Sequence, residues 1–174
     1  MFSCSGSNIL IYMTGHGGDG FLKFQDSEEL TSTELGDAIE QMYQKRRYNE
    51  ILLITDTCQA ESMGQKLYSP NVVSIASSRV GEDSLSHHGD SSIGVYMIDR
   101  YTYHALDFLE RVHLNSTKTL QNFFNVCPKR QCVSTVATRT DLFRRDPKTT
   151  RLTDFFASIA QVSLIHLTDD PVSV

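Results

Sequence analysis

The sequence lacks an excess of positive charge, long hydrophobic runs, and any repeat or low-complexity tract. Its 16 basic and 21 acidic residues leave a net charge of −5, which argues against a phosphate-binding surface and so against nucleic acid. The apolar runs at residues 9–13 and 51–54 are far shorter than the ~18 residues needed to span a bilayer. No basic, apolar leader precedes them. The sequence as written therefore predicts neither a membrane span nor a secretion signal of its own.

What is present is typical of one globular domain. The chain has 174 residues, of which 40% are hydrophobic and 21% are charged. One domain takes about 150 residues, and a chain of this size buries roughly 70% of its unfolded surface on folding. No Pro-, Gly- or Ser-rich linker divides the chain.

The first third predicts a strand–helix–strand crossover. Residues 8–13 form an apolar run without alternation, which is typical of a strand buried on both faces, and residues 51–55 form a second. Thr31 and Glu34 between them match a capping box at a helix start. Apolar residues then recur at helical spacing, at Leu35, Ala38, Ile39, Met42 and Tyr43. A crossover of this kind implies two parallel strands.

The rest of the chain continues the alternation of strands and helices. It predicts helices at residues 61–67, 95–112 and 119–126, strands at 71–76, 133–137 and 152–156, and a polar loop at 79–92. We therefore expect an α/β fold with a mostly parallel sheet covered by helices on both faces.

A histidine and a cysteine follow the ends of the first two predicted strands. Open α/β sheets bind ligands beyond the carboxyl ends of their parallel strands, where His16 and Cys58 both lie. Alone, a histidine near glycines is often only a turn residue, and a cysteine after a strand is usually a small buried hydrophobe. Together they match a cysteine nucleophile and the base that supplies its thiolate. The backbone amides of Gly17 and Cys58 are candidates for an oxyanion hole, which indicates acyl transfer.

Other chemically active residues give weaker signals. His87, His88 and Asp90 lack the rest of a metal-ligand set, so we interpret them as a solvated loop and expect no metal and no cofactor. Cys127 and Cys132 are compatible with a local disulfide in an oxidising compartment or with free thiols. Asn115 begins a possible N-glycosylation site, which mildly supports a luminal setting.

Several segments together resemble a known family. Residues 14–18, 21–26, 56–59 and 76–84 resemble the catalytic subunits of GPI-anchor transamidases, which belong to the legumain-like cysteine peptidases and share the caspase-type α/β fold. Later segments at 99–102, 126–129 and 139–143 are similar too. The resemblance covers roughly residues 7–163, which we expect to be the catalytic domain, followed by an extension at 164–174.

The resemblance implies roles for individual residues. Cys58 is expected to attack the substrate carbonyl while His16 acts as base and then as acid, with the amides of Gly17 and Cys58 holding the oxyanion. Ser77 and Ser78 are expected to line the pocket for the small residue retained on the product. Asp56 occupies the place of an acidic pocket residue in related endopeptidases.

The resemblance also implies substrates, partners and a location. The substrates are a proprotein with a C-terminal signal peptide and the GPI glycolipid, whose ethanolamine amine resolves the thioester. The partners are the other subunits of the transamidase complex, on the luminal face of the endoplasmic reticulum. The family's first strand and helix have no counterpart here, so the sequence predicts an N-terminally truncated domain with one unpaired sheet edge and weak activity in isolation.

Two alternative functions stay open at this point. An asparaginyl endopeptidase of the same clan uses the same chemistry with water as acceptor, although the residues around Cys58 do not match a legumain cysteine box. A catalytically silent, truncated isoform acting as an interaction module belongs to a different functional class. A caspase fits less well, because its order of residues around the nucleophile is not found here.

Overall fold

The computed structural model describes residues 6–25 and 27–156, and the centre of this part is a four-stranded sheet in the order β1-β5-β6-β9. Strands β1 (Asn8–Thr14), β5 (Glu50–Asp56) and β6 (Val72–Ala76) are parallel. Strand β9 (Ala137–Arg139) pairs antiparallel with β6. The predicted α/β fold with a mostly parallel sheet is confirmed.

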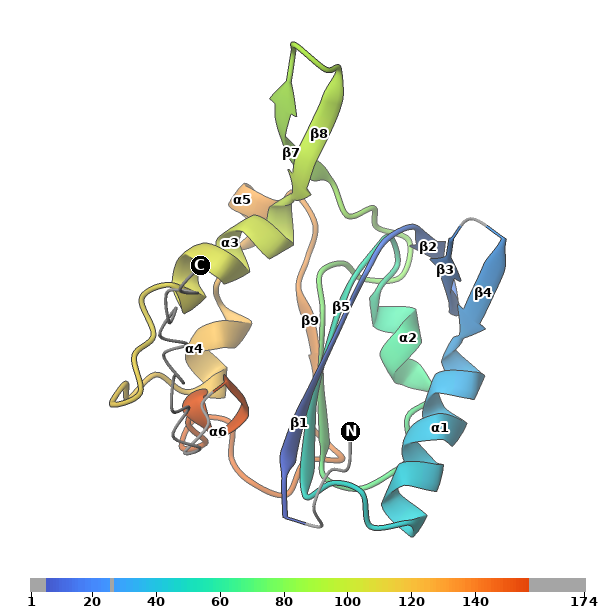
Figure 1. Cartoon of the computed structure of the whole chain (residues 1–174), viewed down its shortest axis with the longest axis vertical. Helices are drawn as coiled ribbons and strands as arrows, with labels where there is room; N and C mark the ends of the chain where they lie inside the picture. The colour runs from blue at the N-terminus through green and yellow to red at the C-terminus, as the bar shows by residue number, and fades with distance from the viewer. Residues whose placement is uncertain (1–5, 26, 157–174) are drawn as a thin grey trace, which may run out of the picture.

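Helices cover both faces of this sheet (Figure 1). On one face lie α1 (Ser32–Gln44) and α2 (Glu61–Gln65), and on the other lie α3 (Arg100–Leu109), α4 (Leu120–Phe124) and α6 (Thr153–Phe156). The short α5 (Lys129–Cys132) lies near α3. The predicted helices in 61–67 and 119–126 are confirmed, each slightly shorter than expected.

Strand β5 separates two hydrophobic cores. All seven of its residues are buried, as the unbroken apolar run predicted. Ile51 and Leu53 pack with residues of α1 and α2, whereas Leu52 and Ile54 pack with residues of α3 and α4. Because successive side chains of a strand point to opposite faces, one central strand supplies both cores.

The start of α1 is as predicted, and its buried face is predicted in part, since Leu35 and Ile39 are buried as expected. Thr31 and Glu34 form the expected capping box, with the Glu34 amide donating to Thr31 Oγ1 at 3.2 Å. Ala38 and Tyr43, which were expected inside, are exposed. Gly36 is buried instead, where the residue that follows α2 packs closely against α1. A Cβ atom at this position would lie only 2.6 Å from the backbone oxygen of that residue. Close approach of the two helices turns the helix face away from the predicted stripe.

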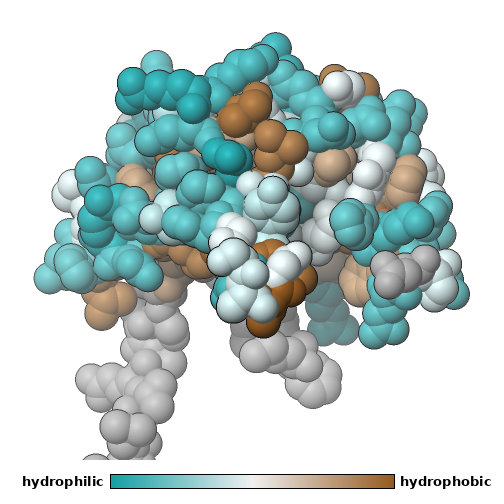
Figure 2. Space-filling model, turned by 90° about the horizontal axis from the view of Figure 1, so that it is seen from above, coloured by the Kyte–Doolittle hydropathy of each residue, from teal (hydrophilic) through white to brown (hydrophobic). Residues whose placement is uncertain are grey.

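A hairpin replaces the predicted loop at 79–92 and the first turns of the predicted helix at 95–112. Strands β7 (Ser86–Asp90) and β8 (Val95–Asp99) pair antiparallel, and Gly94 in the turn has φ +71°. The helical part begins only at Arg100. Strand pairing overrides the helical spacing because the β-branched and aromatic residues of 95–98 suit a pleated strand. This hairpin projects from the fold (Figure 1), and the surface on its side is mostly hydrophilic with small separate hydrophobic groups (Figure 2).

Two predicted strands near the end of the described chain were wrong. The strand expected at 133–137 begins only at Ala137, after Val133 adopts a left-handed φ of +68° at the end of α5. The segment expected as a strand at 152–156 is instead α6. Three short strands that the sequence did not predict form a separate antiparallel sheet between β1 and α1, namely β2 (Gly17–Gly18), β3 (Phe21–Phe24) and β4 (Glu28–Thr31).

The description ends at Phe156, so the last part of the predicted domain at 7–163 and the predicted extension at 164–174 lie outside the described residues. Within 6–25 and 27–156, none of the helices has the length and apolar character needed to cross a membrane.

Candidate active site

The parallel register of β1 and β5 brings His16 and Cys58 to one pocket. Thr14 pairs with Asp56, so the two strands end at the same edge of the sheet. His16 and Cys58 each follow two residues later. A pocket of about 210 Å³ lies at this edge, and its lining consists of Gly15, His16, Asp56, Thr57, Cys58, Ser84, Ser86 and Asp99. The two residues singled out from the sequence therefore share one cavity.

Cys58 sits half-buried in this pocket with a protonated thiol favoured. Its Sγ lies 3.9 Å from the carbonyl oxygen of Ser84, to which the thiol donates a weak hydrogen bond. Burial raises the pKa of the Cys58 thiol, and the nearby carboxylates of Asp83 and Asp99 raise it further. A thiol of this kind needs a base to accept its proton at neutral pH. The exposed imidazole of His16 lines the same pocket and is a candidate for this base.

The amide of Gly17 is left free by the β2–β3 pairing. The Lys23 amide donates to the His16 carbonyl at 2.8 Å, and Gly17 stands opposite Leu22. In an antiparallel pair, residues next to a hydrogen-bonded pair turn their amides away from the partner strand. Gly17 therefore keeps a donor outside the ladder, next to His16. A Cβ atom at this position would lie 2.5 Å from Thr57 Oγ1, so the close approach to the nucleophile turn requires glycine.

Asp56 lines the pocket, yet its carboxylate is occupied by neighbours. It is buried and accepts hydrogen bonds from Ser84 Oγ at 2.7 Å and from Thr102 Oγ1 at 2.6 Å. The Thr102 amide donates to the same carboxylate at 3.2 Å. These bonds attach the loop before the hairpin and the first turn of α3 to the end of β5. The family resemblance implies that Asp56 is a substrate-binding residue of the pocket. In this structure the hydrogen bonds of its carboxylate join the residues that form the pocket wall.

Ser77 and Ser78 lie behind the nucleophile turn. Both are completely buried and are not among the residues that line the pocket. Ser78 Oγ donates to the Thr57 carbonyl at 2.7 Å and accepts from the Ala60 amide at 3.1 Å, and Ser77 Oγ donates to the same Thr57 carbonyl at 3.4 Å. Their hydroxyls thus support the backbone on either side of Cys58.

Sequence reasoning missed Asp99, Ser84 and Ser86 as pocket residues. Asp99 accepts from Thr14 Oγ1 at 3.0 Å and from Ser86 Oγ at 3.4 Å. Ser86 and Asp99 are paired at the base of the hairpin, so the pocket wall exists only because the hairpin forms. Recognising 95–99 as a strand would have placed Asp99 at a strand end beside the site.

The histidines of the hairpin form an aromatic group. His87 and His88 lie on β7 rather than in the expected solvated loop, with ring centroids 4.1 Å apart, and His88 lies 4.8 Å from the ring of Tyr103. Among residues 6–25 and 27–156, no cluster of histidine, cysteine or carboxylate side chains is arranged to hold a metal ion.

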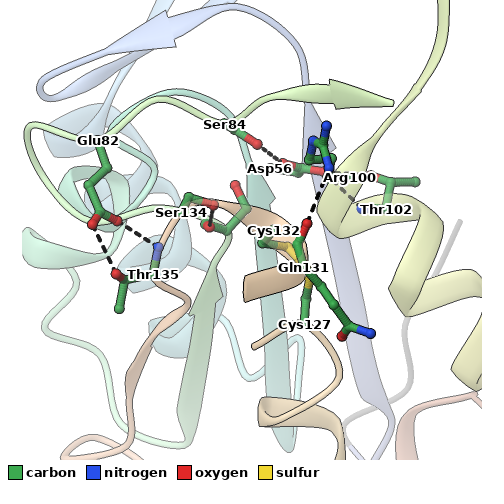
Figure 3. Close-up of a disulfide and its surroundings, with 11 residues drawn as sticks. Asp56, Glu82, Ser84, Arg100, Thr102, Cys127, Gln131, Cys132, Ser134 and Thr135 are labelled. Carbon is green, nitrogen blue, oxygen red and sulfur yellow. Dashed lines mark hydrogen bonds between the residues drawn. A yellow bond between two sulfur atoms is a disulfide. The ribbon is translucent and has the colours of Figure 1, made fainter. Parts of the chain in front are cut away.

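Cys127 and Cys132 form a disulfide with a Cα–Cα distance of 5.6 Å, which decides between the two states that the sequence left open (Figure 3). Disulfides are typical of proteins from oxidising compartments. Asn115 is exposed between α3 and α4, where a glycan is sterically allowed; its glycosylation stays a prediction.

Comparison with known proteins adds the family context. A family model described as the peptidase C13 family matches residues 2–152. The chain is 64% identical over 159 residues to a protein named putative GPI-anchor transamidase from Drosophila melanogaster, covering 91% of this chain and 45% of that protein. It is 61% identical over 158 residues to the GPI-anchor transamidase of Homo sapiens, covering 91% and 40%. For the GPI-anchor transamidase of Saccharomyces cerevisiae the identity is 55% over 156 residues, covering 90% and 38%. The chain thus spans less than half the length of these relatives.

Proposed function

This chain belongs to the peptidase C13 family, and we propose that it is the catalytic core of a GPI-anchor transamidase. The observation that carries the proposal is the placement of His16 and Cys58 in one pocket at the carboxyl ends of adjacent parallel strands. Transfer to a GPI anchor is proposed because its relatives are GPI-anchor transamidases, since a cysteine–histidine pair alone serves hydrolysis equally well.

The first half-reaction forms a thioester. His16 accepts the proton of the Cys58 thiol, and Sγ attacks the carbonyl carbon at the cleavage point of the proprotein. The amides of Gly17 and Cys58 donate to the resulting oxyanion. When the tetrahedral intermediate collapses, His16 returns its proton to the nitrogen of the departing signal peptide. The protein is then held on Cys58 as an acyl group.

The second half-reaction replaces sulfur with nitrogen. The ethanolamine amine of the GPI glycolipid attacks the thioester, His16 takes a proton from this amine, and Cys58 departs as a thiolate that is reprotonated. A pocket of about 210 Å³ suits a small residue at the acyl position. Asp56 is proposed to bound this pocket, whereas Ser77 and Ser78 act on the small residue through the turn that they support.

The proposed partners are the C-terminal signal peptide of the proprotein, the GPI glycolipid and the other subunits of a transamidase complex. The proposed location is the lumen of the endoplasmic reticulum. The Cys127–Cys132 disulfide and the exposed Asn115 support this setting, because both modifications belong to the secretory pathway.

Trapping with a small amine tests the proposal. A proprotein reporter is incubated with the complex that contains this chain, in the presence of hydrazine or hydroxylamine. Transfer predicts a reporter that ends in a hydrazide or hydroxamate, and Cys58→Ala and His16→Ala abolish it. Cleavage that gives only a free carboxylate would instead identify an asparaginyl endopeptidase. A cellular effect that survives in both variants would identify a silent interaction module.

A further inference from the structure

Glu82 does not line the pocket, and its carboxylate accepts four hydrogen bonds. Its Oε1 accepts from Lys129 Nζ at 3.0 Å and from Thr135 Oγ1 at 2.9 Å. Its Oε2 accepts from the Thr135 amide at 2.6 Å and from the Arg79 amide at 3.3 Å. The bond from Lys129 and those from Thr135 lower the pKa of Glu82 to about 2, so the carboxylate is charged at neutral pH.

The backbone of Glu82 contacts the residue next to the nucleophile. The Gln59 amide donates to the Glu82 carbonyl at 2.9 Å, and the Gly81 amide donates back to Gln59 Oε1 at 3.1 Å. Gln59 has φ +54°, a left-handed conformation that is strained for a residue with a Cβ and persists only where surrounding contacts impose it. The direction of the Cys58 amide and thiol depends on this turn.

The same loop contacts Cys58 directly. Ser84, two residues after Glu82, accepts the weak hydrogen bond from the Cys58 thiol and donates to Asp56. The loop therefore touches Gln59 through Glu82 and Cys58 through Ser84. Any movement of Glu82 is transmitted to both residues.

Two of the three residues that donate to Glu82 come from the segment that contains the disulfide. Lys129 lies between Cys127 and Cys132, and Thr135 follows three residues after the second cysteine. Ser134 Oγ donates to the Ser77 carbonyl at 2.7 Å, which ties this segment to the end of β6. The carboxylate of Glu82 is thus attached through Lys129 to the loop that the disulfide closes, and through Thr135 to the residues just after that loop.

We propose that Glu82 is a positioning residue for the nucleophile turn, holding Gln59 and Cys58 in place through its attachment to segment 127–135, which begins with the loop closed by the Cys127–Cys132 disulfide. A carboxylate that serves only overall stability would change the unfolding free energy alone. A positioning residue also changes how the folded protein reacts. The proposal rests on the proposed role of Cys58 as nucleophile, but not on whether an amine or water accepts the acyl group from it.

Glu82→Gln tests the proposal because the side chain keeps its size while one oxygen becomes an NH₂ group facing donors. The first readout is the rate of Cys58 alkylation by iodoacetamide against pH, measured on the full chain by peptide mass spectrometry. Within this loop the hydrogen bond with Ser84 lowers the pKa of Cys58 and Asp83 raises it, so release of the loop is expected to change the labelling midpoint from its wild-type value. The second readout is the turnover of the complex at saturating reporter. We expect kcat to fall about 10- to 100-fold, the usual effect of a misplacement near 1 Å, with KM changed less than threefold.

Asp141→Asn is the matched control, because it removes a carboxylate paired with Arg139 away from the pocket. It is expected to keep the wild-type midpoint and kcat. If Glu82→Gln also keeps both, with kcat within threefold of wild type, the proposal is overturned. If Glu82→Gln fails to fold, Thr135→Val is tested instead, because it removes only the side-chain donor to Glu82. The loss of one hydrogen bond is expected to lower kcat about fivefold. An unchanged kcat in this variant overturns the proposal. Hydrolysis without amine transfer would refute the transamidase function and leave the alkylation result valid.

Discussion

Replacing Gly17 with alanine is the sharpest test of the candidate active site. The new Cβ atom would lie 2.5 Å from Thr57 Oγ1 and 2.7 Å from the Phe21 carbonyl oxygen, whereas ordinary contact begins near 3.4 Å. Thr57 is buried and the Phe21 oxygen belongs to the backbone of β3. Neither neighbour can turn aside, so the strand that carries Gly17 must shift by about 1 Å.

Two consequences of this shift have different magnitudes. Overpacking in a well-packed region costs about 1–3 kcal/mol of unfolding free energy. Loss of one oxyanion donor costs about 10²- to 10³-fold in kcat, and a displaced Gly17 amide no longer points at the oxyanion. We therefore expect a protein that still folds but has lost most of its turnover.

The assay combines urea unfolding of the chain with the turnover of the complex at saturating reporter. Gly6→Ala is the matched control, because a Cβ atom there meets nothing within 4 Å, and it is expected to keep wild-type values. A Gly17→Ala protein that retains kcat within about threefold of wild type would refute the oxyanion role assigned to this amide.

Three further predictions concern the nucleophile, the core and the disulfide. Because burial and two carboxylates raise the pKa of Cys58, its alkylation by iodoacetamide should reach half-maximum at a higher pH than that of an ordinary thiol; a midpoint at or below the ordinary range contradicts this environment. Leu52→Ala, at a fully buried position in β5, should lower the unfolding free energy by about 2–5 kcal/mol in urea titrations, and a loss below 1 kcal/mol would show that β5 is not central to the core. Replacing Cys127 and Cys132 with serine should cost about 2 kcal/mol by loop-closure entropy, while an unchanged urea midpoint would argue that the bond adds no stability.

The elements predicted correctly are those that local patterns specify. The apolar runs of β1 and β5 need no alternation because both faces are covered, and the capping box at Thr31 and Glu34 acts within one turn of α1. These signals lie in single stretches of chain. They also place His16 and Cys58 at one sheet edge, because the carboxyl ends of parallel strands lie at the same edge and each residue follows a strand end.

The elements predicted wrongly depend on contacts between distant residues. The apolar residues of 95–98 match a helical spacing as well as a strand, and only pairing with β7 selects the strand. The buried face of α1 follows from the close approach at Gly36, which is set by the position of α2. Neither contact is visible in the local sequence.

The sequence by itself determined the fold class, the first strand–helix–strand crossover, the histidine–cysteine pair and the family. Only the tertiary structure decided what surrounds that pair. In the folded structure Ser77 and Ser78 support the nucleophile turn, and the hairpin brings Asp99 to the pocket. Glu82 binds the segment that contains the Cys127–Cys132 disulfide. The physical reason is that local propensity and periodicity describe single segments, whereas hydrogen-bond partners 18 to 53 residues apart, such as Ser78 with Ala60 and Glu82 with Thr135, exist only once the chain has folded.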